Sequence, residues 1–365
     1  MAARNSGEVA KMKFQRQLKH HSVIFRRHAS VDYLLRTLPQ KKSPNNTQNI
    51  PKVPSKPHSN LPPQDLTKLL ITPKQLTINF WPSAYVQPSK VELAMSQGVF
   101  SRAQFKLEWT LAHYDDIPDV KYQRLKAELE AKTTSMEPQK RKSFGIEPHL
   151  LHPLPEILFL GHTNVGKSSL VNNLFGDGSG TLAYVSRQPG YTQTMNCYNV
   201  GKKFRLIDSP GYGMRGEEKQ GQMVLEYLER RKVLRQVYVL IDAAQGVLPE
   251  DEEMLEHLID SGILFDIVLT KVDQVIDRYV AQLPSKIKEA MKKEKTLAPK
   301  TRLDYANQIK ATNGKIKNYF TGLIEGVGLN ELATLPRIFF NNAYKSTYVK
   351  QCYGYKELRH AMALV

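Results

Sequence analysis

The stretch 156–170, EILFLGHTNVGKSSL, restricts what this chain can fold into more than any other. Its first half is a continuous apolar run that predicts a strand buried on both faces, and its second half has the apolar spacing of a helix. The turn between them matches G-x-x-x-x-G-K-[ST], a loop whose backbone N–H groups surround phosphates. The predicted nucleotide-binding residues are Gly161, His162, Thr163, Asn164, Val165, Gly166, Lys167, Ser168 and Ser169.

Two of these residues have expected chemical roles. The Lys167 amine should reach the β- and γ-phosphates and take part in catalysis, and the Ser168 hydroxyl should bind Mg²⁺. A second buried-looking strand, 204–208, ends at Asp208 and is followed by a D-x-x-G pattern that closes at Gly211. We expect Asp208 to hold Mg²⁺ through water and the Gly211 N–H to contact the γ-phosphate, which makes Gly211 a catalytic candidate.

The segment 176–196 between these motifs is polar, contains glycine and lacks helical periodicity. It suits a mobile switch loop in which a threonine binds Mg²⁺ and the γ-phosphate. Thr192 and Thr194 are the candidates, and we prefer Thr192 as the metal ligand and catalytic residue.

Helices and strands alternate after the second motif, which is typical of a mostly parallel sheet with helices on both faces. The expected elements are helix 218–235, strand 237–242, helix 250–261 and strand 265–270. We therefore predict an α/β fold of the P-loop NTPase type, like that of Ras-like GTPases, with an N-terminal extension.

The last of these strands ends in Thr270, Lys271, Val272 and Asp273, which fits the base-reading pattern [NT]-K-x-D. The Asp273 carboxylate can accept hydrogen bonds from guanine N1–H and N2–H₂, which adenine does not offer, while the Lys271 stem lies over the ring. GTP and GDP are the expected ligands. A final strand, 337–340, leads to Asn342 and Ala343, where a backbone N–H is expected to contact guanine O6, and helix 353–363 closes the chain.

The basic character of the chain is concentrated at its N-terminus. Residues 1–64 hold 12 Lys and Arg against Glu8 and Asp32, out of a net charge of +17 for all 365 residues. Within them, 12–38 looks like a mitochondrial presequence, so we assign 1–38 to targeting and 39–64, rich in Pro, Asn, Ser and Lys, to a disordered linker. The alternative is a disordered basic arm that touches RNA or nothing at all, and the alternative location is the cytoplasm.

Two further regions complete the expected organisation. Residues 65–150 regain apolar side chains, include a helix-like stretch at 118–133 and should pack on a GTPase domain of residues 151–365. Within that domain, 285–318 is an insertion with ten Lys and Arg against Glu289, Glu294 and Asp304. It either contacts RNA phosphates or is a solvated charged helix with a lysine-rich loop.

Cysteine content and hydropathy exclude two classes of protein. Cys197 and Cys352 are the only cysteines, so a disulfide framework is excluded and a reducing compartment fits. No apolar run is long enough for a transmembrane segment. The sequence does not specify an oligomeric state, and a monomer is favoured.

The ordered motifs resemble the EngB family of GTPases. The resemblance is carried by PEILFLGHTNVGKSSLVNNL, LAYVSRQPGYTQTMN, RLIDSPGYG and LTKVD, and its PG-x-TQ segment is what points to Thr192. It implies an assembly factor for the large ribosomal subunit, binding the subunit or its rRNA, and with this N-terminus the mitochondrial ribosome. The chain departs from the family pattern at His162-Thr163, at Ser209 and at residues 242–246, which lack the usual arginine.

We accordingly expect a Mg²⁺-dependent GTP hydrolase. The residue after Gly211, where many switch GTPases place a water-orienting Gln, is Tyr212, so intrinsic turnover should be slow, on the order of 10⁻³ per second or below. Asn164 resembles the asparagine with which potassium-activated GTPases hold K⁺, and the alternative is that it braces the loop. The alternative function is a GTP-binding switch or scaffold that hardly hydrolyses GTP and recruits protein partners.

Overall fold

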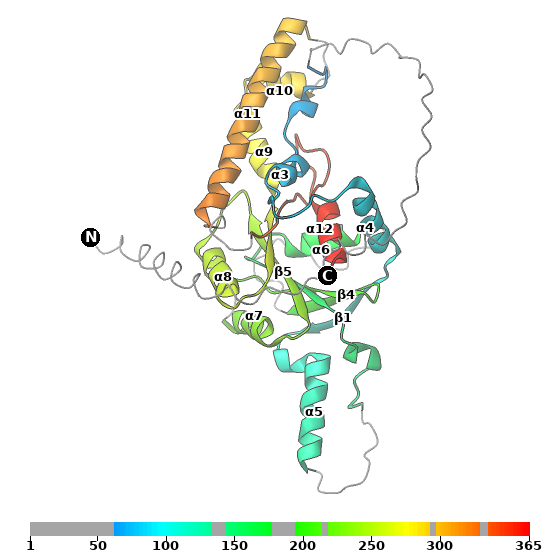
Figure 1. Cartoon of the computed structure of the whole chain (residues 1–365). Helices are drawn as coiled ribbons and strands as arrows, with labels where there is room; N and C mark the ends of the chain where they lie inside the picture. Colours follow the sequence, from blue (N-terminus) through cyan, green and yellow to red (C-terminus); the bar gives the residue numbers. More distant parts are fainter. Residues whose placement is uncertain (1–61, 133–142, 177–193, 214–217, 293–296, 329–334) are drawn as a thin grey trace, which may run out of the picture. The chain divides into compact units, whose positions relative to one another are not determined.

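The computed structural model describes residues 62–132, 143–176, 194–213, 218–292, 297–328 and 335–365 (Figure 1). The described residues belong to one compact unit, Leu61–Val365. The predicted targeting segment, most of the predicted linker and Thr192 lie outside the described residues. None of the helices in the described part of the chain is long and apolar enough to cross a membrane.

The described unit is built on one seven-stranded sheet with the order β1-β3-β4-β2-β5-β6-β7. Pairs from β4 through β2, β5 and β6 to β7 are parallel, whereas β3 is antiparallel to both β1 and β4. The strands are β1 Phe105–Leu111, β2 Glu156–Gly161, β3 Met195–Val200, β4 Phe204–Asp208, β5 Leu234–Asp242, β6 Phe265–Thr270 and β7 Ile338–Phe340.

Helices cover both faces of this sheet. The helices are η1 Leu66–Leu69, α3 Pro73–Asn79, α4 Lys90–Arg102, η2 Tyr114–Asp116, α5 Pro118–Lys132, η3 Pro148–Leu151, α6 Lys167–Phe175, α7 Glu218–Arg230, α8 Pro249–Asp260, α9 Val272–Ala281, α10 Ser285–Lys292, α11 Pro299–Gly326 and α12 Tyr355–Ala363. Alternate residues of β2 enter opposite layers: Leu158 and Leu160 join one hydrophobic cluster, and Ile157 and Phe159 join the other. The predicted α/β fold is confirmed.

Several predicted boundaries need correction. Helix α7 ends at Arg230 rather than at residue 235, because Arg231 turns inward to a buried carboxylate and β5 begins already at Leu234. The closing helix begins at Tyr355, after Gly354 in a left-handed conformation. The predicted insertion consists of α10 and α11, and α11 continues past residue 318 to Gly326.

The region N-terminal to β2 supplies part of the core. Strand β1 pairs with β3, with Phe105 opposite Val200 and Leu111 opposite Met195. Further upstream, the 3-10 helix η1 packs on α11, and Leu66 is fully buried there. The extension is therefore part of the same folded unit as the nucleotide motifs.

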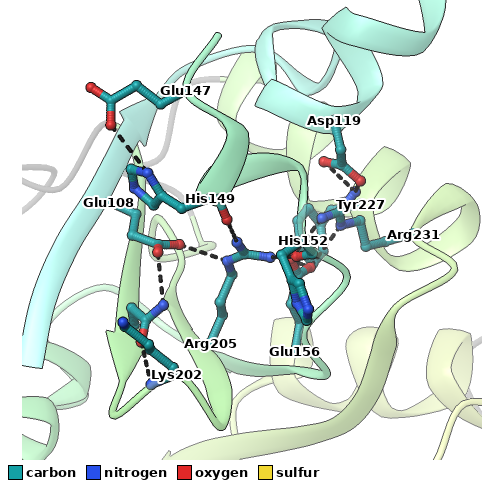
Figure 2. Close-up of polar contacts among 11 residues, drawn as sticks. Glu108, Asp119, Glu147, His149, His152, Glu156, Lys202, Arg205, Tyr227 and Arg231 are labelled. Carbon is teal, nitrogen blue, oxygen red and sulfur yellow. Dashed lines mark hydrogen bonds and ion pairs between the residues drawn. The ribbon is translucent and has the colours of Figure 1, made fainter.

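Buried ion pairs connect this extension to the amino-terminal ends of the parallel strands (Figure 2). The Arg205 guanidinium, on β4, lies 2.6 Å from Glu108 of β1, and both side chains are almost fully buried. Arg231 pairs with Glu156 at the start of β2 and with Asp119 of α5. Arg205 and Arg231 thus each have a carboxylate partner from the extension.

Candidate functional site

The turn between β2 and α6 has the shape of a phosphate-binding loop. Gly161 has φ of +153°, and a Cβ there would lie 2.6 Å from the carbonyl oxygen of Leu240 on the neighbouring strand β5. Gly166, the N-cap of α6, has φ of +111°, and a Cβ there would meet no atom within 4 Å. The first glycine lets the loop pass close to β5, and the second takes the left-handed conformation from which α6 begins, a helix whose first N–H groups can bind an anion.

Lys167 lies within this loop. Its Nζ donates to the carbonyl oxygens of Gly161, at 2.7 Å, and His162, at 3.1 Å. Burial lowers the pKa of the amine to about 8, although Asp208 and Asp251 oppose that shift. The amine therefore stays mainly cationic at neutral pH and is held where phosphates of a nucleotide in the loop would lie.

The two predicted Mg²⁺ ligands that the structure describes meet directly. The Ser168 hydroxyl donates to Oδ2 of Asp208 over 2.9 Å. Asp208 is buried, which raises the pKa of its carboxyl to about 6, and its Oδ1 has no hydrogen-bond partner among the described residues. A hydroxyl beside a carboxylate with one free buried oxygen fits Mg²⁺, which prefers oxygen ligands and takes the remainder from phosphates and water.

Within the ranges described, no group of three or more His, Cys, Asp or Glu side chains could hold a metal ion.

The D-x-x-G turn packs against the phosphate loop. The Thr163 N–H donates to the carbonyl oxygen of Tyr212 over 3.0 Å, and a Cβ on Gly211 would lie 2.7 Å from Cα of Thr163. The His162 ring fills the space next to Gly213, where a Cβ would lie 2.1 Å from Nε2. Glycines at 211 and 213 thus allow the two loops to lie in direct contact.

The base-reading motif lies on the other side of the phosphate loop. Strand β6 ends at Thr270, whose hydroxyl donates to the carbonyl oxygen of Val165 over 2.7 Å. The Nζ of Lys271, a residue with φ of +53°, lies 2.6 Å from Oδ2 of Asp242 at the end of β5. Phosphate and base motifs are therefore joined by a direct hydrogen bond.

Asp273 lies in the first turn of α9. Burial, reinforced by the neighbouring charge of Asp277, raises the pKa of its carboxyl to about 6. At neutral pH the carboxylate is ionised, as recognition of guanine N1–H and N2–H₂ requires.

The turn after β7 lies beside α6, since the Asn173 side chain donates to the carbonyl oxygen of Ala343 over 3.0 Å. The Asn342 side chain folds the loop that follows, because its amide donates to the carbonyl oxygens of Tyr344 and Gln351 and its oxygen accepts from the Tyr353 N–H. The guanine O6 contact of Asn342 and Ala343 stays a prediction. Ser169, in the first turn of α6, has its hydroxyl 3.5 Å from that of Tyr344.

Sequence reasoning missed two acidic residues at this site. Asp242 pairs with Lys271, and its place at the carboxyl end of a central parallel strand was an available signal. Asp251 accepts a hydrogen bond from the Tyr212 hydroxyl. No signal distinguishes Asp251, because acidic residues are common in the first turn of helices.

Comparisons with known proteins agree with this geometry. A family model described as a 50S ribosome-binding GTPase matches residues 156–271. MIOREX complex component 8 of Saccharomyces cerevisiae is 30% identical over 283 residues, which cover 76% of this chain and 75% of that protein. A probable GTP-binding protein EngB from a Ruegeria species is 38% identical over 149 residues, covering 40% of this chain and 68% of its own.

Among solved structures, Era from Aquifex aeolicus bound to GDP and AlF₄⁻ is similar to this chain, with 20% identity and a TM-score of 0.33 over 53% of this chain and 52% of its own. The residues matched by the family model hold the phosphate loop, the D-x-x-G turn and the first two residues of the base-reading motif. The chain belongs to the EngB family of GTP-binding GTPases.

Proposed function

We propose that this chain hydrolyses GTP to GDP and phosphate and acts as an assembly factor for the large subunit of the mitochondrial ribosome. The observation that carries the proposal is the meeting of Lys167, the Ser168–Asp208 pair and the Thr270–Asp273 motif around one loop. A site with these parts can hold a guanine nucleotide and its metal ion together.

The residues act mainly by positioning and by electrostatics. Lys167 and the backbone N–H groups of the loop would hold the β- and γ-phosphates, while the Gly211 N–H would contact the γ-phosphate. Ser168 and Asp208, with Thr192 as a further proposed ligand, would hold Mg²⁺. When bound, Mg²⁺ neutralises charge on the phosphate oxygens.

Hydrolysis by the isolated protein should be slow. Tyr212 has no amide to orient a water molecule, and its hydroxyl is already bonded to Asp251. Stimulation must come from a bound particle or an ion. The proposed ion is potassium held by the exposed Asn164 side chain, and the alternative is that this side chain braces the loop.

Two observations support a ribosomal partner in mitochondria. The matching family model is described as ribosome-binding, and residues 12–38 have the composition of a mitochondrial presequence. A monomer that binds the large subunit through its rRNA is the simplest form of the proposal.

Sedimentation tests the function. Tagged protein from fractionated mitochondria should move with large ribosomal subunits in a non-hydrolysable GTP analogue and leave them in GDP, while Lys167→Ala should not move with them in either nucleotide. Nucleotide-independent behaviour, or absence from ribosomal fractions, would favour a switch or scaffold that recruits other proteins.

Import tests the compartment. A reporter fused to residues 1–64 should enter mitochondria, and the same fusion with Arg26→Glu and Arg27→Glu should stay outside, because import requires a positively charged amphipathic segment. A wild-type fusion found wholly in the cytosol would contradict the mitochondrial assignment.

A further inference from the structure

The helices α10 and α11 present exposed lysines that the nucleotide site does not use. We call this the basic surface, and it consists of Lys286 and Lys292 on α10 and Lys300, Lys310, Lys315 and Lys317 on α11. At about 1.5 Å rise per residue, the lysines of α11 extend over roughly 25 Å. We propose that the basic surface binds the phosphate backbone of RNA.

The basic surface rests on a well-packed scaffold. Helix α11 runs along α9 (Figure 1) and buries Ile309, Ile316 and Phe320 completely. On the same helix the Asn313 side chain donates to the carbonyl oxygen of Leu69 and accepts from the Ile71 N–H, which attaches α11 to η1. The lysines therefore project from a fixed helix, so their spacing is set before any ligand binds.

The charge of this surface is not compensated within the described part of the protein. The only acidic residues on α10 and α11 are Glu289, Asp304 and Glu325, and no described carboxylate lies within ion-pair distance of the six lysines. By contrast, Lys121 and Lys126 of the extension each have a carboxylate partner. Uncompensated like charges along one helix repel each other, and a polyanion relieves that repulsion.

The side chains between the lysines favour RNA over a membrane surface. Leu303 is the one large apolar residue of α11 that is strongly exposed, whereas Asn307, Ala311, Gly314 and Asn318 are exposed small or polar residues. A helix that lies in a membrane interface needs a continuous bulky apolar face. Small side chains beside lysines instead allow a phosphate backbone to approach closely.

A second set of contacts connects α11 to the guanine-reading residues. The Tyr319 hydroxyl of α11 donates to the carbonyl oxygen of Ala243 over 2.6 Å, and the preceding residue, Asp242, pairs with Lys271. The helix that carries four of the six lysines is thus in direct contact with the segment that follows β5. The inference rests on the proposed ribosomal function and adds the surface and the chemistry through which the particle is recognised.

The test is the salt dependence of binding of the full-length protein to a fluorescent RNA hairpin. The variant Lys310→Glu, Lys315→Glu and Lys317→Glu is compared with Lys106→Glu, Lys203→Glu and Lys232→Glu, which changes net charge equally at exposed lysines outside α10 and α11. Since each phosphate contact contributes about 0.9 to the slope of log K against log salt, the α11 variant should lose roughly 2–3 from that slope. The control variant should keep the wild-type slope.

Unchanged GDP affinity in both variants shows that they are folded. Equal slopes in the two variants would overturn the inference. RNA binding would then depend on net charge, which the two variants share, or on the basic N-terminus, which neither variant changes. The inference would also be overturned if the α11 variant lost binding to phosphatidylcholine–cardiolipin vesicles but bound RNA as the wild type does. The basic surface would then be a membrane-binding surface. The RNA-binding assay uses neither ribosomes nor GTP turnover. Failure of this inference can therefore be told apart from failure of the ribosomal proposal, which the sedimentation experiment tests.

Discussion

The Tyr212 hydroxyl donates a hydrogen bond to Oδ1 of Asp251 over 2.7 Å, which attaches the D-x-x-G turn to the start of α8. The other oxygen of Asp251 accepts from the Leu248 N–H at 3.0 Å, so the carboxylate is fixed at the helix end. Tyr212 directly follows Gly211, whose N–H is proposed to contact the γ-phosphate. The bond therefore helps to hold that N–H in place before GTP arrives.

Removing this hydroxyl should affect GTP more than GDP. In Tyr212→Phe we expect GTP affinity to fall roughly five- to twentyfold (about 1–2 kcal/mol), because part of the binding free energy is then used to order the turn. GDP, which lacks the γ-phosphate, should bind nearly as before. Tyr238→Phe is the matched control, since the buried Tyr238 hydroxyl has no hydrogen-bond partner among the described residues. Equal losses for GTP and GDP would contradict the role of Tyr212.

Base choice should follow the carboxylate of Asp273. Asp273→Asn replaces an acceptor of two hydrogen bonds by an amide, which can donate to the additional carbonyl oxygen of xanthine. Preference should move from GDP to XDP, as measured by competition against a fluorescent guanine nucleotide. Full GDP affinity in this variant would show that residues 270–273 do not read the base.

The raised pKa of Asp273, about 6, predicts a pH dependence of GDP binding. The protonated carboxyl can no longer accept from both guanine donors, so affinity is retained above the pKa and falls as the pH drops through it. One pH unit below the pKa the loss should be roughly tenfold. Titration of a fluorescent GDP analogue gives the midpoint, and the part of the transition that belongs to Asp273 should be absent from the residual GDP binding of Asp273→Asn.

Breaking the buried pair of Arg205 and Glu108 should destabilise the protein more than replacing both residues by apolar ones. Glu108→Ala leaves a buried guanidinium without its carboxylate and should lower the free energy of unfolding by about 3–5 kcal/mol. The double variant Glu108→Leu and Arg205→Met should lose less than Glu108→Ala alone. Urea denaturation measures both, and Glu130→Ala, which removes the exposed partner of Lys126, should cost about 1 kcal/mol or less.

Potassium should accelerate GTP turnover if Asn164 holds the ion. We expect faster turnover in potassium than in sodium at equal ionic strength, and loss of the difference in Asn164→Ala, because a cation at the phosphates stabilises developing charge. Both salts are compared with and without large ribosomal subunits. Equal wild-type rates under every condition would leave the ribosome as the source of stimulation.

The parts of the site that could be predicted from sequence are those fixed by local backbone geometry. Gly161, Asp208 and Thr270 lie at ends of buried strands, and the carboxyl ends of parallel strands must meet at one edge of the sheet. Apolar runs alone identified those strands. The order of the motifs was then enough to predict the fold.

The parts that could not be predicted depend on contacts between distant residues. Residues 105–111 were expected only as part of an extension. Their place in the sheet beside β3 depends on the pairing of residues far apart in the sequence, such as Phe105 and Val200. The backbone N–H contact to guanine O6 stays a prediction, but no sequence pattern indicated that the Asn342 side chain folds the loop that follows. The Tyr212–Asp251 bond likewise joins elements whose distance only the folded structure sets.

The docking of η1 on α11 sets a limit on proteolytic maturation. Leu66 is buried, and the backbone on either side of Leu70 is bonded to the Asn313 side chain. A protease that removed a targeting segment by cutting beyond this point would strip apolar side chains from the core and expose the inner face of α11. The mature N-terminus, where import is followed by cleavage, should therefore be found upstream of Asp65, within the lysine- and proline-rich segment.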